Sequence, residues 1–114
     1  MKTAIIGSRN LNVTDFTPYL PEGTTEIVSG GAKGIDQSAK AFTLANNLRY
    51  TEFLPDYARY KRGAPLKRNI EIIEYADVVL AFWDGQSRGT KFVIEKCREI
   101  GKPVEVFMAH GNSI

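Results

Sequence analysis

The sequence predicts a single three-layer α/β domain, with a mainly parallel five-stranded sheet and helices on both of its faces. Five short apolar segments alternate with stretches of helical periodicity, an arrangement typical of parallel sheets. The segment Asp77–Trp83 (DVVLAFW) is apolar beyond its first residue rather than alternating, as expected for a strand covered on both faces. The chain has 114 residues, which suits one domain of ~100–150 residues and leaves little room for a second.

Strands are expected wherever a short apolar run rich in β-branched or aromatic side chains appears. The last of these runs is expected to form an edge strand. In chain order the expected strands are Thr3–Gly7, Glu26–Ser29, Tyr50–Leu54, Asp77–Trp83 and Val104–Met108.

Helices are expected between the strands, the first a short one over Thr14–Leu20. A second begins near Ile35 and closes at Asn46-Asn47, and Pro65 suits the first turn of a third. Gly101 ends the fourth. The residues expected on the inner faces of the three longer helices are Ile35, Ala39, Phe42 and Ala45; Ile70, Ile73 and Ala76; and Thr90, Val93, Ile94, Cys97 and Ile100.

Composition excludes several classes of function. A single Cys97 excludes an internal disulfide framework and a cysteine zinc site, and a single His110 excludes a histidine metal cluster. Met1-Lys2-Thr3 leads directly into the first strand and does not resemble a signal peptide, and no apolar run is long enough for a membrane helix. We therefore expect a cytoplasmic domain over residues 1–109 that needs no metal or cofactor and has no membrane partner, followed by a frayed tail at 110–114.

Basic residues are concentrated in one short stretch, although the net charge is only +2. Between Tyr57 and Ile70 there are five cations and no acid: Arg59, Lys61, Arg62, Lys67 and Arg68. A solvated loop would account for them. A rim that attracts a nucleotide phosphate or a nucleic-acid backbone is the alternative.

Glycine-rich polar loops follow three of the strands. Their sequences are Gly7-Ser8-Arg9, Ser29-Gly30-Gly31-Ala32-Lys33-Gly34-Ile35-Asp36 and Asp84-Gly85-Gln86-Ser87-Arg88-Gly89-Thr90. In a doubly wound, Rossmann-like sheet these loops meet at the carboxyl edge, where the first and fourth strands should flank the reversal of strand order. Backbone N–H groups and helix N-termini there favour a phosphate-bearing ligand. Neither a Walker loop nor the G-x-G-x-x-G dinucleotide motif is present.

These loops, together with Arg68-Asn69 and the segment Ala76–Gly85, resemble the SLOG superfamily over almost the whole chain. The likeness is closest to its small stand-alone branch related to YspA and YpsA, a domain of unknown function. The superfamily also includes the cytokinin-activating phosphoribohydrolases ("lysine decarboxylase-like" proteins) and the DNA-processing protein DprA. The resemblance implies a Rossmann-like domain that binds a nucleotide or a nucleotide-derived ligand such as ADP-ribose, in some systems as a sensor, and that forms homo-oligomers.

The related hydrolases carry a Gly-Thr-x-x-Glu motif whose Glu acts on the N-glycosidic bond. Here Val93 stands at that position after Gly89-Thr90, so the resemblance implies binding more directly than catalysis. Glu95 lies on the opposite face of the helix, and Lys91 or Arg98 is its expected partner. A hydrolase or transferase acting on a nucleotide remains one alternative. Single-stranded nucleic-acid binding, with Tyr57 and Tyr60 stacking bases beside the cations, is another.

Three further residues have two interpretations each. Asp36 either stabilises the first turn of a helix or accepts ribose hydroxyls, and Asp84 either forms an Asp-Gly turn or contacts ligand. Trp83 is either a core residue or a stacking platform for a base. The full set of candidate ligand-binding residues is Gly7, Ser8, Arg9, Ser29, Gly30, Gly31, Ala32, Gly34, Asp36, Arg68, Asn69, Trp83, Asp84, Gly85, Ser87, Arg88, Gly89 and Thr90. No catalytic residue is assigned.

Overall fold

A computed structural model describes residues 1–109 and confirms the α/β fold. All five strands are parallel and lie in the order β3-β2-β1-β4-β5, so β5 is an edge strand as expected. The bounds are β1 Lys2–Gly7, β2 Glu26–Ser29, β3 Arg49–Glu52, β4 Val78–Trp83 and β5 Val104–Met108; α1 Ile35–Ala45, α2 Tyr57–Tyr60, α3 Ala64–Tyr75 and α4 Arg88–Ile100. The expected tail at 110–114 lies outside the described residues.

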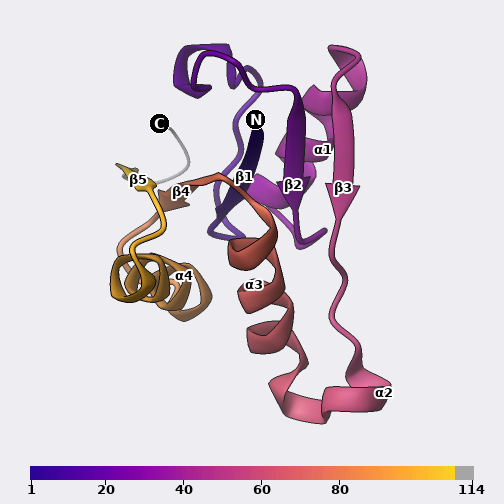
Figure 1. Cartoon of the computed structure of the whole chain (residues 1–114), viewed down its shortest axis with the longest axis vertical. Coiled ribbons are helices and arrows are strands. Elements are labelled where there is room, and N and C mark those ends of the chain that lie inside the picture. Colours follow the sequence, from indigo (N-terminus) through magenta and orange to yellow (C-terminus); the bar gives the residue numbers. More distant parts are fainter. Residues whose placement is uncertain (110–114) are drawn as a thin grey trace.

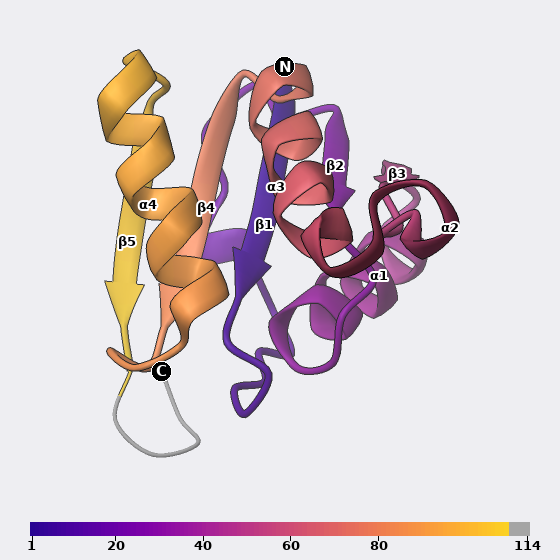
Figure 2. The same cartoon turned by 90° about the horizontal axis from the view of Figure 1, so that it is seen from below.

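The sheet has helices on both faces (Figures 1 and 2). Helix α1 packs on one face, where Ile35, Ala39 and Phe42 join the cluster around Ile5 and Leu80. Helices α3 and α4 lie side by side on the other face. Continuous burial of the central strands β1 and β4 explains why residues 4–6 and 79–82 are all apolar.

The helix ends follow the sequence signals. Gly101 takes a left-handed conformation (φ 77°) at the end of α4, and Asn46 closes α1 by donating its backbone and side-chain N–H groups to the carbonyl of Phe42. Pro65 occupies the first turn of α3. Among the residues described, no helix is long and apolar enough to span a membrane.

The segment Thr14–Leu20 forms only a 3-10 turn, Thr17–Tyr19, instead of the expected short helix. Leu20 is extended (ψ 132°) because it precedes Pro21, which disfavours helical backbone in its neighbour. Strand β3 is shifted toward the N-terminus from the expected Tyr50–Leu54, because β2 offers no partner beyond Ser29, which pairs with Glu52.

All three longer helices also differ in part from expectation. Ala45 is exposed because it lies at the end of α1. Ile72 is buried in α3 beside Ile73, while Ile70 is only half-buried. Ile100 is 49% exposed because α4 ends there, beyond its contact with the sheet. The cationic stretch contains a short helix, α2, that the sequence analysis did not predict. It projects past the carboxyl ends of β2 and β3 (Figure 1).

Candidate functional site

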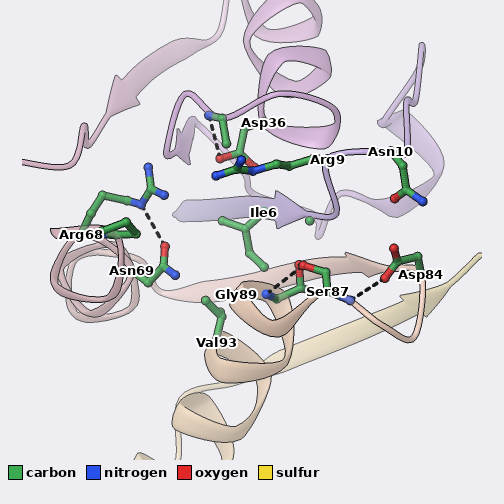
Figure 3. A pocket seen from close by; sticks show the side chains of 14 residues that line it. Ile6, Arg9, Asn10, Asp36, Arg68, Asn69, Asp84, Ser87, Gly89 and Val93 are labelled. Carbon is green, nitrogen blue, oxygen red and sulfur yellow. Dashed lines mark hydrogen bonds between the residues drawn. The ribbon is translucent and has the colours of Figure 1, made fainter. Parts of the chain in front are cut away.

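A cavity of about 410 Å³ opens at the carboxyl ends of β1 and β4. These strands flank the point where strand order reverses, which is where doubly wound sheets bind ligands. Figure 3 shows Arg9 and Asp36 on one side of the cavity and Ser87 and Gly89 on the other. The residues that line it are Ile6, Gly7, Arg9, Asn10, Ala32, Asp36, Pro65, Arg68, Asn69, Asp84, Ser87, Gly89, Thr90 and Val93.

The cavity brings together candidates from all three glycine-rich loops and from α3. Those that line it are Gly7, Arg9, Ala32, Asp36, Arg68, Asn69, Asp84, Ser87, Gly89 and Thr90. The other candidates lie outside the lining: Ser8, Ser29, Gly30, Gly31, Gly34, Trp83, Gly85 and Arg88. The candidates expected from the sequence therefore coincide with the cavity in part, and some of the others support the loops around it.

Both candidate serines outside the lining hold the strand ends together. The Ser29 hydroxyl donates to the carbonyl of Ile5 over 2.7 Å. The Ser8 hydroxyl accepts the backbone N–H of Asp84 over 3.1 Å, and its carbonyl accepts the N–H of Ile35 over 3.4 Å. These bonds link the carboxyl ends of the central strands to the helix starts.

Gly34 allows the first loop to approach the start of α1. Its backbone has φ 77° and ψ −124°, a region that only glycine adopts readily. A Cβ there would lie 2.5 Å from the carbonyl oxygens of both Ser8 and Arg9. Gly31 also has positive φ (73°), and a Cβ there would meet Leu54 and Glu52 rather than the cavity.

Arg68 is buried, with 8% of its surface exposed, and acts first as a scaffold. Its Nη1 donates to the carbonyl of Gly30 over 2.5 Å and more weakly to that of Phe53 over 3.5 Å. Its Nε donates to Oδ1 of Asn69 over 2.9 Å. The α3 side chain thus ties the loop after β2 to the wall of the cavity.

The Asp84 side chain fixes the loop between β4 and α4, in the manner of an Asp-Gly turn. Oδ1 accepts the backbone N–H groups of Gln86 and Ser87, both over 2.8 Å, and these bonds hold the Asp84 pKa below its usual value. The Ser87 side chain then caps α4 by accepting the N–H of Thr90. Trp83 packs against the core and donates its Nε1–H to the carbonyl of Ser87. Of the two roles considered for Trp83, this arrangement agrees with a core residue.

Asp36 is 5% exposed, in the first turn of α1. Its Oδ2 accepts the N–H of Ala32 over 3.3 Å, while its Oδ1 has no hydrogen-bond partner. Burial raises the pKa of this carboxyl, and the Ala32 N–H and the Arg68 guanidinium act in the opposite direction.

Four lining residues were missed by the sequence analysis: Ile6, Asn10, Pro65 and Val93. Asn10 lies one position beyond the first loop motif, so a slightly wider window would have included it. Ile6 and Val93 are buried, at 6% and 2% exposure, and their apolar character indicates only core. Val93 nevertheless lines the cavity, so the wall offers an apolar surface there.

Glu95 is exposed on α4 and pairs with Lys91 over 3.8 Å, one of its two expected partners.

The chain has no significant match among protein-family models, curated proteins or solved structures. The geometry of the cavity is therefore the basis for assigning a function.

The raised pKa of Asp36 has a consequence for stability. Asp36 becomes protonated at a higher pH in the native state than in the unfolded chain. The ionised carboxylate therefore lowers the free energy of unfolding at neutral pH. This loss of stability is relieved as the pH falls toward the unfolded pKa of 3.8. Urea unfolding at pH 7, 6, 5 and 4 should show wild type gaining stability relative to Asp36→Asn as pH falls. A relative gain by the variant would contradict the burial cost assigned to the carboxylate.

Proposed function

We propose that the cavity binds a nucleotide or nucleotide-derived ligand through its phosphate. The supporting observation is that the N-terminus of α4 and Arg9 face one cavity at the switch point of the sheet. Gly89 lies in the first turn of α4, where backbone N–H groups lack partners within the helix, and such termini attract anions. Its missing side chain leaves this approach open, since a Cβ there would have no neighbour within 4 Å.

The remaining wall suits the rest of a nucleotide. Ile6, Val93 and Pro65 offer apolar surface for a base or the face of a sugar, and Asn10 and Asn69 offer amide donors and acceptors. The volume of about 410 Å³ falls within the ~300–1,000 Å³ of small-molecule sites. A sensing role would add a partner chain to this binding domain, and a homo-oligomer is the assembly that the SLOG resemblance implies.

Binding is proposed rather than catalysis. The two acids of the lining are Asp36 and Asp84, and the Asp84 Oδ1 is already engaged by the turn. No carboxylate stands at Val93, the position that the related hydrolases use. No residue of the lining is therefore assigned a catalytic role.

Native mass spectrometry of the gently purified protein tests the proposal first. A co-purifying nucleotide or ADP-ribose derivative, identified after denaturation, would support it. An empty protein would then be titrated with AMP, ADP, NAD and ADP-ribose by isothermal calorimetry. Failure of all four to bind would contradict the proposed function.

The α2 segment favours a second candidate function, the binding of single-stranded nucleic acid. Arg59, Lys61 and Arg62 are exposed, and Tyr57 is 58% exposed beside them. The Tyr60 ring is already covered by the cations of Arg59 and Lys67, at 5.2 and 5.8 Å from its centroid, which leaves Tyr57 as the free stacking surface.

If this second function is correct, the affinity for an oligonucleotide should fall as the salt concentration rises. The double variant Arg59→Gln/Arg62→Gln should show a smaller fall, because it makes fewer phosphate contacts. Fluorescence anisotropy with a labelled oligothymidylate measures both effects. AMP binding by the same double variant should remain unchanged, because neither residue lines the cavity. Equal oligonucleotide affinity in wild type and variant would eliminate the α2 segment as a nucleic-acid surface.

A further inference from the structure

Asp36 lines the cavity and carries a buried carboxylate oxygen without a hydrogen-bond partner. Within residues 1–109, its Oδ1 is the one buried side-chain nitrogen or oxygen without a hydrogen-bond partner. The residue lines the cavity from the first turn of α1 and is 5% exposed. Buried polar atoms in folded proteins are nearly always paired, so an unpaired oxygen on a residue of the cavity wall points to a partner that arrives with a ligand.

The fold itself does not supply that partner. The N–H groups of Gly7 and Gly30 lie close enough to stabilise the charge, but neither donates a hydrogen bond of acceptable geometry to Oδ1. Arg68 donates instead to the carbonyls of Gly30 and Phe53 and forms no ion pair with Asp36 within 4.0 Å. Glu26 shows the contrast, because its buried carboxylate accepts the hydroxyls of both Tyr75 and Thr51.

The missing partner must be a hydrogen-bond donor. Two cations, Arg9 and Arg68, and two acids, Asp36 and Asp84, line the cavity, so their formal charges balance. A phosphate oxygen would be repelled by a carboxylate, which assigns the phosphate to the α4 terminus and Asp36 to another part of the ligand. A sugar hydroxyl is a neutral donor that lies only a few bonds from a nucleotide phosphate.

We propose that Oδ1 of Asp36 accepts a hydrogen bond from a ribose hydroxyl of the ligand, so that the cavity selects ribonucleotides over their deoxy analogues. This inference rests on the proposed function and specifies its ligand class. Selection follows because a deoxy ligand leaves the carboxylate buried and unpaired. Sites built to bond a hydroxyl reject analogues that lack it for this reason.

Isothermal calorimetry with AMP, 2′-deoxy-AMP, 3′-deoxy-AMP and inorganic phosphate tests the inference. Wild type should bind at least one deoxy analogue about ten-fold or more weakly than AMP, as expected for the loss of a charge-assisted hydrogen bond. Asp36→Asn should weaken AMP binding and narrow the gap between AMP and that analogue, because a neutral amide oxygen accepts the hydroxyl more weakly than a carboxylate does. Glu95→Gln, which removes one negative charge from the exposed face of α4, should leave the gap unchanged.

A measurement on the wild-type chain keeps the test independent of any variant. The carboxyl ¹³C resonance of Asp36 should shift when AMP binds, and less when the weaker deoxy analogue binds at saturation. Equal affinities for AMP and both analogues, or a gap of unchanged size in Asp36→Asn, would overturn this inference while phosphate binding still supported the proposed function. Failure of both inorganic phosphate and AMP to bind would count against the proposed function itself.

Discussion

Gly89→Glu is expected to lower the affinity for AMP by roughly 100-fold, about 2.7 kcal/mol, without unfolding the protein. The new carboxylate would occupy the α4 terminus that the phosphate is proposed to use, and would repel it. The fold should tolerate the change because a Cβ at Gly89 meets nothing within 4 Å. Stability should even rise by up to about 1 kcal/mol, since glycine is a poor helix former and an acid suits the first turn.

Two matched variants separate the causes of that loss. Gly89→Gln has nearly the same size without the charge, and Gly89→Ala adds only a methyl group. Calorimetry should place the affinity of Gly89→Gln between those of Gly89→Ala and Gly89→Glu, with Gly89→Ala within a few-fold of wild type. Wild-type affinity in Gly89→Glu would locate the phosphate away from α4.

Gly34→Ala is expected to destabilise the fold by about 3 kcal/mol or more. The methyl group would clash with the carbonyls of Ser8 and Arg9 at 2.5 Å, and the backbone conformation would itself be strained. The loop after β1 and the start of α1 would have to separate, which would shift Arg9 relative to Asp36 on their shared side of the cavity. Chemical denaturation monitored by circular dichroism gives the free energy of unfolding.

Gly23 provides the control for this prediction. Its φ of 88° is also positive, but a Cβ there meets nothing within 4 Å. Gly23→Ala should therefore cost only the backbone strain, about 1–2 kcal/mol. Similar losses for the two variants would show that the contact at Gly34 relaxes easily.

Local signals in the sequence were sufficient for most of the fold. The apolar run at Val78–Trp83 predicts a strand covered on both faces, and Gly101, Asn46 and Pro65 predict helix ends because each acts within its own turn. The prediction of a helix was wrong at Thr14–Leu20, where Pro21 keeps Leu20 extended. The predicted burial was also wrong at Ile70 and Ile100, whose exposure depends on the distance to neighbouring elements.

The candidate site was predictable only in outline. Glycine-rich loops after parallel strands must meet at one edge, and this fact alone groups Gly7, Gly89 and Asp36. The sequence does not show which polar atoms the fold itself uses. Ser8 and Ser29 have the side chains of ligand contacts, but the structure engages both in bonds between strand ends.

The sequence by itself determined the parallel α/β architecture and the edge of the sheet at which a ligand would bind, because periodicity and turn chemistry are local. Tertiary structure alone decided that Pro65 of α3 joins Asn69 in the wall of the cavity, beside the β4–α4 loop. It also decided that the Asp84 Oδ1 is satisfied by its own turn while the Asp36 Oδ1 is left buried and unpaired. Burial and hydrogen-bond satisfaction depend on residues far apart in the chain, and only the packed molecule specifies them.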